Sequence, residues 1–159
     1  RNVILGKVVT ATTTRGTSID SVGRIHIAQP NGSHCMKFFA SVVGNEIGSI
    51  SVTASVTSYN TSSDYRLKEN VVTDWDATTR LKQLKPSRFN FIADADTTVD
   101  GFLAHEVQTI VPEAITGTKD AVDVDGNAVM QGIDQSKLVP LLVKTIQELE
   151  ARITTLEGE

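Results

Sequence analysis

The sequence lacks paired cysteines, long apolar runs and an excess of basic charge. It holds one cysteine, Cys35, among 159 residues, so no disulfide can form within the chain. No apolar run approaches the roughly 20 residues that a helix needs to cross a bilayer, and residues 1–5 lack the layout of a signal peptide. The net charge is −4 with both signs interspersed, so we expect neither nucleic acid nor a membrane as a partner.

Aromatic residues are also scarce. They make up 5% of the chain against 40% for all apolar residues, a balance that allows a core but favours slender β structure. The length is compatible with one domain or a small pair. The chain starts at Arg1 without a methionine, and we take this to indicate a segment of a longer protein.

Residues 1–62 are rich in threonine, serine and glycine and predict short β-strands. Two β-branched runs, at residues 3–5 and 8–9, are followed by an alternating segment at residues 24–27. The clearest pattern covers residues 50–56, where apolar residues alternate with serine or threonine, which is typical of a strand with one apolar face. Strands with so few large side chains bury little surface in a monomer. We therefore expect one chain's share of an interwound stem resembling a triple β-helix.

A polar linker at residues 59–64 marks the expected domain boundary, which we place between Ser62 and Ser63. The fold class is α+β: a β stem at 1–62 and a small α+β domain at 63–159. The elements predicted beyond the linker are a strand starting in 67–72, a helix from the N-cap Asp76 to about Lys85, a strand at 88–92, an acidic turn at 94–100, a short helix ending near Pro112, and a hairpin at 121–130 turning at Asp125 and Gly126.

The last element is a helix over about 136–157, with Ser136 as N-cap and Pro140 in the first turn. Its apolar residues recur at alternating steps of three and four, as in a coiled coil. They are Val139, Leu142, Ile146, Leu149, Ile153 and Leu156. Such a helix needs either self-association or docking on its own domain, and we expect self-association. β-branched residues at the a positions with leucine at d favour two strands in model systems.

Ser63 and Lys68 form a candidate catalytic pair. A serine hydroxyl becomes a nucleophile when a base takes its proton, and serine–lysine dyads do this without histidine. A free lysine has a pKa of about 10.4, so the base must be buried away from anions to be neutral. Leu67 and Val71 offer apolar surroundings, whereas Asp64 and Glu69 would favour the charged lysine unless their side chains point away. Taken by spacing alone, such a pair is more typical of an exposed loop.

A longer string of residues resembles a known family. The segments that carry the resemblance are Thr61-Ser62-Ser63-Asp64-Tyr65-Arg66-Leu67-Lys68-Glu69-Asn70, Leu84-Lys85-Pro86-Ser87-Arg88-Phe89-Asn90-Phe91, Gly101-Phe102-Leu103-Ala104-His105-Glu106-Val107, Val111-Pro112-Glu113-Ala114 and Lys137-Leu138-Val139-Pro140-Leu141-Leu142. Together they are similar to the C-terminal intramolecular chaperone and autoprotease domain of bacteriophage tail spikes and tail fibres, of the endosialidase type. Residues 1–62 are similar in style to the end of a fibre's β region.

The resemblance implies a function for the whole chain. The domain would form a homotrimer, assist folding of the upstream fibre chain, and then cleave itself off. It implies Ser63 as nucleophile, Lys68 as base, the bond between Ser62 and Ser63 as the cleavage site, and a turn-shaping role for Asp64. Ser62 is adjacent and stays open as the nucleophile. The hairpin at 121–130 corresponds to arms that embrace the stem.

The same resemblance implies where the parts act. Residues 1–62 would belong to the virion's tail fibre, and the chaperone part would be made in the host cytoplasm and released. Two alternatives stay open: a non-cleaving fibre tip that binds a receptor, and a structural trimerisation cap.

No cofactor or metal is expected. His26, His34, Cys35 and His105 have no metal-ligand spacing. Residues 123–127 hint at a calcium loop but fit a hairpin turn better. Trp75 is expected to anchor a loop to the core, with sugar binding as the weaker reading.

Overall fold

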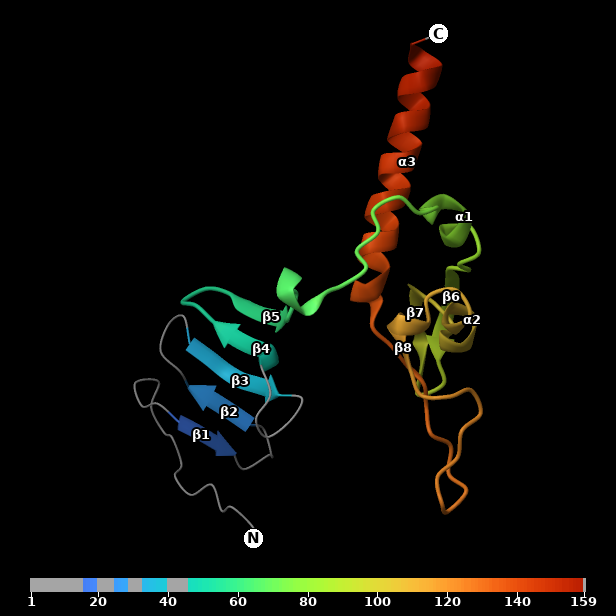
Figure 1. Cartoon of the computed structure of the whole chain (residues 1–159). Coiled ribbons are helices and arrows are strands. Elements are labelled where there is room, and N and C mark those ends of the chain that lie inside the picture. The colour runs from blue at the N-terminus through green and yellow to red at the C-terminus, as the bar shows by residue number, and fades with distance from the viewer. Residues whose placement is uncertain (1–15, 20–24, 29–32, 40–45, 159) are drawn as a thin grey trace. The chain divides into compact units, whose positions relative to one another are not determined.

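The computed structural model describes residues 16–19, 25–28, 33–39 and 46–158 of the chain (Figure 1). Within them it has the mixed α+β composition that the sequence predicts. Contacts between residues divide the chain into two compact units, Arg1–Val71 and Val72–Glu159, called here the β unit and the α+β unit. The β-branched runs at residues 3–5 and 8–9 lie outside the described residues.

The β unit consists of short antiparallel strands. β1 (Gly16–Ile19) pairs with β2 (Ile25–Ala28). β3 (Ser33–Phe39), β4 (Glu46–Val52) and β5 (Thr57–Thr61) form a three-stranded sheet in that order. The strands pair within the chain, and the interwound stem, which belongs to an assembly of chains, stays a prediction.

The single strand predicted from the alternation at residues 50–56 does not form. β4 ends at Val52, and the N–H of Thr53 donates to the carbonyl oxygen of Val56 at 2.8 Å, closing a tight turn. The Thr53 hydroxyl accepts from the N–H groups of Ser55 and Val56 at 3.3 and 3.1 Å. A threonine hydroxyl that satisfies nearby N–H groups competes with the strand ladder, so the chain reverses here. β5 therefore occupies much of the segment predicted as a linker.

The α+β unit alternates helices and strands along the chain (Figure 1). They are α1 (Ala77–Leu81), β6 (Ser87–Phe91), β7 (Asp94–Gly101), α2 (Ala104–Gln108), β8 (Ile115–Thr116), β9 (Gly132–Ile133) and α3 (Val139–Glu157). β6 pairs with β7 and β8 with β9, both antiparallel. The helix predicted from Asp76 is confirmed in place, since its carboxylate caps the helix by accepting from the N–H of Thr79 at 3.0 Å, but it is shorter than predicted.

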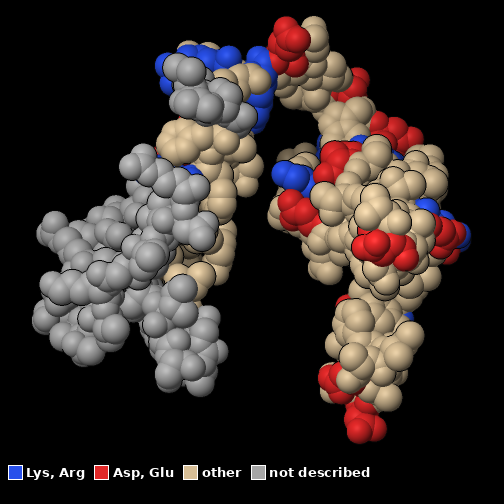
Figure 2. Space-filling model, turned by 90° about the horizontal axis from the view of Figure 1, so that it is seen from below, with Lys and Arg blue, Asp and Glu red and all other residues tan. Residues whose placement is uncertain are grey.

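The core of this unit joins α1, the segment from α2 to Ala114, and the start of α3. Its buried apolar residues are Ala77, Val107, Val111, Ala114, Leu138 and Leu141. Trp75 packs against them, which agrees with its predicted role as a loop anchor. This core is small, and many large apolar side chains of the described residues remain exposed. In Figure 2, much of the surface of the described residues is formed by residues other than lysine, arginine, aspartate and glutamate.

Residues 94–100 are predicted as an acidic turn, and this prediction is wrong. They lie in β7, where Val99 and its neighbour Thr98 are β-branched and face partners across β6. Arg88 of β6 pairs with Asp100 of β7 at 2.7 Å. β-branched residues favour strands, and a cross-strand ion pair removes part of the repulsion between the acidic residues.

The start of α3 differs from the prediction by its cap. Ser136 is not the N-cap of α3, which begins after Leu138 without a side-chain cap. Asp134 caps the residues just before it, because its carboxylate accepts from the N–H and the hydroxyl of Ser136 at 3.0 and 2.6 Å. A 3-10 turn (Gln135–Leu138) then leads into the helix. Pro140 lies in the first turn as predicted, where its missing N–H costs no hydrogen bond.

α3 presents two different faces. Leu141 and Thr145 are buried against the unit's own core, and α1 packs along this side. The predicted seam lies elsewhere and is open to solvent: Val139, Leu142, Ile146, Leu149, Ile153 and Leu156 are between 42% and 73% exposed. The side of α3 that docks on its own domain is thus different from the side that carries the seam predicted for self-association. No helix among the described residues has the length and apolar character to cross a membrane.

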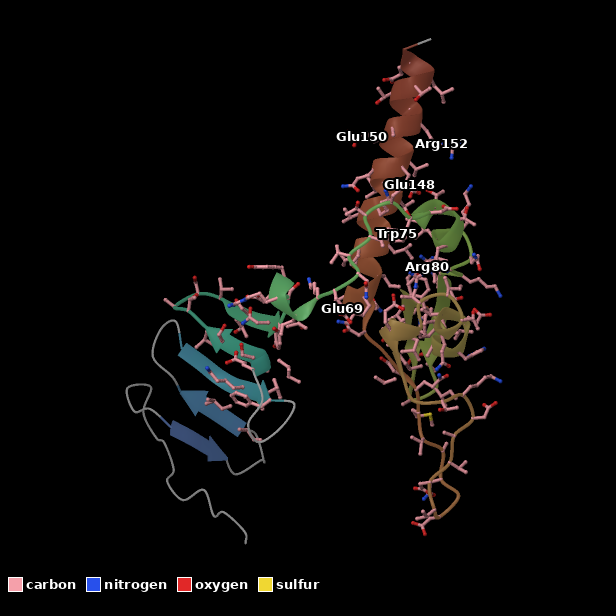
Figure 3. The ribbon with its side chains drawn as sticks, viewed as in Figure 1. Glu69, Trp75, Arg80, Glu148, Glu150 and Arg152 are labelled. Atoms are coloured by element: carbon pink, nitrogen blue, oxygen red, sulfur yellow. The ribbon has the colours of Figure 1, made fainter. Side chains whose placement is uncertain are left out.

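Glu148 ties α3 to α1. Figure 3 labels Glu148 on α3. Its carboxylate accepts from the N–H of Ala77 at 3.0 Å, and from the N–H and hydroxyl of Thr78 at 2.8 and 2.6 Å. The N–H groups at the start of α1 have no partners within that helix, so a carboxylate here satisfies them and favours the local helix dipole. The hydrogen bond from Ala77, followed by that from the Thr78 side chain, lowers the pKa of Glu148 below its usual value.

We expect Glu148→Gln to lower the melting temperature at pH 7 by a few degrees, because a neutral amide loses one acceptor and the charge. A lowered pKa stabilises the fold above the ordinary pKa of a glutamate, and this contribution disappears as the pH falls through the folded-state pKa. The difference between wild type and variant should therefore shrink below about pH 4. Glu150→Gln, which changes an exposed glutamate on the same helix, is the matched control. Equal melting temperatures for the two variants would refute the capping role.

The segment at 121–130 is an irregular hairpin. Val122 and Ala128 form an isolated antiparallel bridge, and the N–H of Gly126 donates to the carbonyl oxygen of Asp123 at 3.1 Å. Gly126 has a φ of +83°, a left-handed conformation that glycine adopts readily, as the predicted turn requires. The apolar side chains of Val124 and Met130 stand fully or mostly exposed along it.

Candidate active site

The predicted cleavage site lies at the margin of the β unit's sheet. The N–H of Ser62 donates to the carbonyl oxygen of Ile47 at 3.0 Å, which continues the β4–β5 pairing one step beyond β5. Ser63 follows it directly. The sheet thereby holds the residue whose carbonyl carbon would be attacked.

A 3-10 turn (Tyr65–Leu67) comes next, in place of the strand predicted to start in residues 67–72. The Asp64 carboxylate accepts from the N–H of Arg66 at 2.9 Å, and the N–H of Lys68 donates to the carbonyl oxygen of Tyr65 at 3.0 Å. These local bonds outweigh the strand propensity of the apolar residues. In an extended chain, residues 63 and 68 would lie about 17 Å apart, whereas the turn brings them close together.

Ser63 and Lys68 meet across this turn. The Lys68 Nζ lies 2.7 Å from the Ser63 Oγ, a short hydrogen bond between the two side chains that the sequence singles out. Both residues are exposed to solvent in the described chain. A neutral amine at this distance is placed to accept the hydroxyl proton directly, which is the geometry that general-base activation of a serine needs.

The two adjacent serines differ in their surroundings. The hydrogen bond of Lys68 goes to Ser63. Ser62 instead lines an open hollow of about 460 Å³ together with Glu46, Asp64, Arg66 and Leu67. These contacts favour Ser63 over Ser62 as the residue that a lysine base would activate.

Asp64 and Arg66 form a two-point ion pair inside the same turn. Arg66 Nε donates to Asp64 Oδ1 at 2.9 Å, and Arg66 Nη2 donates to Asp64 Oδ2 at 2.8 Å. The Arg66 side chain, and then its backbone N–H, hold the pKa of Asp64 below its usual value, and the same pair raises the pKa of Arg66. The carboxylate thus caps the turn and stays ionised, as a turn-shaping residue would.

Other candidates from the sequence do not gather into a site. Among the described residues, no three histidine, cysteine, aspartate or glutamate side chains come together as metal ligands. The Asp123 carboxylate of the candidate calcium loop accepts from the N–H groups of Asp125 and Asn127, both at 2.9 Å. It serves the hairpin turn.

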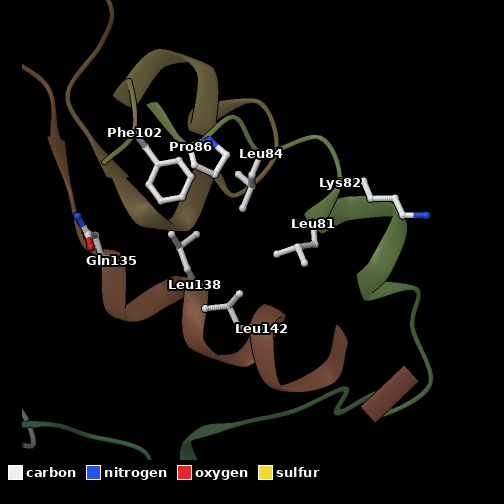
Figure 4. A pocket seen from close by; sticks show the side chains of 8 residues that line it. All are labelled: Leu81, Lys82, Leu84, Pro86, Phe102, Gln135, Leu138 and Leu142. Atoms are coloured by element: carbon white, nitrogen blue, oxygen red, sulfur yellow. The ribbon is translucent and has the colours of Figure 1, made fainter. Parts of the chain in front are cut away.

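Sequence reasoning missed an apolar pocket in the α+β unit, with a volume of about 470 Å³ (Figure 4). It is lined by Leu81, Lys82, Leu84, Pro86, Phe102, Gln135, Leu138 and Leu142. These residues come from three separate stretches of the chain, so no local pattern could reveal it. Leu142 belongs to both the pocket wall and the exposed seam of α3.

Comparison with protein families finds a match for part of the second half. The family model described as the chaperone of endosialidase matches residues 63–116. Residues 63–116 are thus similar to the chaperone of endosialidase. By its name this family is a peptidase family, in keeping with a domain that cleaves its own chain. No protein in the curated collection matches the chain.

The matched segment begins at Ser63 and ends at Thr116, after α2 and the 3-10 turn (Pro112–Ala114). Its first residue is the predicted nucleophile. The compact β unit extends further, to Val71, so the turn with Ser63 and Lys68 packs with the strands that precede it. The resemblance noted for residues 137–142 and the coiled coil lies beyond the matched range and stays a prediction.

Proposed function

We propose that the chaperone domain forms a homotrimer, assists folding of the β segment that precedes it, and then releases itself by cutting the bond between Ser62 and Ser63. The observation that carries the cleavage step is the 2.7 Å contact between Lys68 Nζ and Ser63 Oγ at the start of the matched segment. In this account residues 1–62 remain with a tail fibre, and the chaperone part leaves in the host cytoplasm.

The reaction proceeds in two halves. The neutral amine of Lys68 takes the proton of the Ser63 hydroxyl, and Oγ attacks the carbonyl carbon of Ser62. The bond from that carbon to the nitrogen of Ser63 breaks, and the Lys68 ammonium returns the proton to the departing nitrogen. This leaves an ester between the Ser62 carbonyl and Ser63 Oγ. Water, with Lys68 again as base, then hydrolyses the ester to a Ser62 carboxylate and a free Ser63 hydroxyl.

The exposure of the dyad suggests when the reaction happens. A lysine acts as a base in its neutral form, which removal from water favours. Both Ser63 and Lys68 are solvent-exposed in the described single chain. In the proposal, the neighbouring chains of the trimer cover this turn, so cleavage follows assembly.

Support for assembly comes from the exposed seam of α3. An apolar stripe that stays uncovered along a long helix is a typical self-association surface. It continues at Leu142 into the wall of the apolar pocket. The residues at the a and d positions favour a two-helix coiled coil in model systems. The proposal of three helices therefore rests on the family resemblance and on contacts made by the rest of the domain.

The ester gives the proposal a chemical test. The full chain is collected unfolded in guanidinium, refolded by dilution, and treated with hydroxylamine at neutral pH. We expect hydroxylamine to accelerate cleavage and to leave a hydroxamate on the carboxyl end of Ser62, detected by mass. Cleavage that proceeds without ever giving a hydroxamate would rule out the ester.

The alternative is a trimeric fibre tip or cap that does not cleave. The exposure of the dyad in the single chain is the observation that favours it. A refolded trimer that stays full length over a day would establish this alternative.

A further inference from the structure

The turn that joins Ser63 to Lys68 also contains a carboxylate, which poses an electrostatic problem. Asp64 lies next to the nucleophile and close enough to Lys68 for a favourable charge interaction. A carboxylate beside a lysine favours the ammonium form, which has no lone pair with which to accept a proton. An unpaired Asp64 would therefore work against the base that cleavage requires.

Arg66 occupies both oxygens of that carboxylate. Its guanidinium donates to Oδ1 at 2.9 Å and to Oδ2 at 2.8 Å, a two-point geometry that a lysine cannot reproduce. The Lys68 Nζ is hydrogen-bonded to the Ser63 Oγ instead. Each basic side chain of the turn thus has its own partner: Arg66 pairs with Asp64, and Lys68 pairs with Ser63.

We propose that Arg66 is a positioning residue for the cleavage reaction: its guanidinium holds and neutralises the Asp64 carboxylate, which leaves the Lys68 amine to Ser63. The proposal rests on the proposed function, because it assigns a role within the same site. It goes beyond shaping the turn. The turn itself needs an acceptor for the N–H of Arg66, which an asparagine supplies as well as an aspartate.

The other charged groups around the turn are accounted for. Glu69 follows Lys68 in the chain. Glu46 of β4 lines the same hollow and pairs with Lys37 of β3 at 2.8 Å. Within residues 63–68 the charged side chains are Asp64, Arg66 and Lys68.

The test is the pH dependence of cleavage. Full-length wild type, Arg66→Gln, Asp64→Asn and the double variant are refolded from guanidinium into buffers from about pH 6 to 10. The cleaved fraction is followed by denaturing gel, and assembly by light scattering. A charge change at this distance near the surface should move the midpoint of the rate–pH curve by about 0.5 to 1 unit.

We expect Arg66→Gln to move the midpoint to higher pH and to slow cleavage at neutral pH by about 3- to 10-fold. Asp64→Asn should move it to lower pH, and the double variant should return close to wild type. The shift in Arg66→Gln should diminish at 1 M salt.

An unchanged midpoint in Arg66→Gln, or a double variant that behaves like Arg66→Gln, overturns the role of Arg66 while leaving the dyad intact. If wild type never cleaves, or if Ser63→Ala cleaves as fast as wild type, the proposed function is refuted and the role of Arg66 with it. The two failures are therefore distinguished within one experiment.

Discussion

Replacing Ser63 or Lys68 with alanine is expected to leave the chain in one piece under conditions in which wild type divides. In the proposed reaction the Ser63 hydroxyl is the nucleophile and the Lys68 amine is the base, and the two atoms lie 2.7 Å apart. Loss of either should slow cleavage by at least about 100-fold. The measurement is a time course on a denaturing gel after refolding.

Two matched controls sharpen this result. Lys68→Arg keeps a positive charge and a donor for Ser63 but cannot lose its proton, so it should fail to cleave. Ser62→Ala removes the neighbouring hydroxyl, which lines the hollow and makes no contact that the reaction uses, so it should still cleave. Cleavage that stops in Ser62→Ala but continues in Ser63→Ala would reassign the nucleophile to Ser62.

Placing aspartate at both Ile146 and Ile153 is expected to convert the proposed trimer to a monomer. Both residues lie on the seam, at 63% and 53% exposure, and outside the core of their own unit. Burying an isoleucine contributes about 2 kcal/mol per chain, so one layer of three contributes about 6 kcal/mol. Charges on the seam would add repulsion to that loss. Light scattering at micromolar concentration measures the mass.

The matched control is aspartate at Gln147 and Thr154, which follow the two isoleucines and are exposed off the seam. It adds the same charges to the same helix turns and should leave the trimer intact. Because Leu141 and Thr145 still dock on the core, both double variants should keep their helical circular dichroism. A seam variant that remains trimeric would exclude the coiled coil as the element of assembly. In the proposed account the monomeric variant also cleaves more slowly.

Features set by short-range chemistry could be read from the sequence. Asp76 is an N-cap because its carboxylate reaches the N–H of Thr79, a contact within three residues. The turn at Asp125 and Gly126 follows from the positive φ that glycine accepts. Ser63 and Lys68 were identified by a family motif, and spacing alone did not select them.

Features set by competition between partners were predicted less well. Thr53 closes a turn inside an alternating pattern, because its hydroxyl satisfies N–H groups that a strand would have paired. The acidic residues of 94–100 enter β7 because partners in β6 outweigh their turn propensity. Glu148 and the start of α1 are about seventy residues apart in the sequence, so the cap they form required the folded chain.

The central claim is that Ser63 cuts the chain at its own amino side with Lys68 as base. Intact mass spectrometry of refolded wild type and Lys68→Ala tests it most directly. We predict a wild-type C-terminal fragment that begins at Ser63 with a free amine and an N-terminal fragment that ends in the Ser62 carboxylate, their masses together exceeding the uncut chain by one water. Lys68→Ala should give the uncut mass. Fragments that begin at another residue, or the same fragments from Lys68→Ala, would contradict the account.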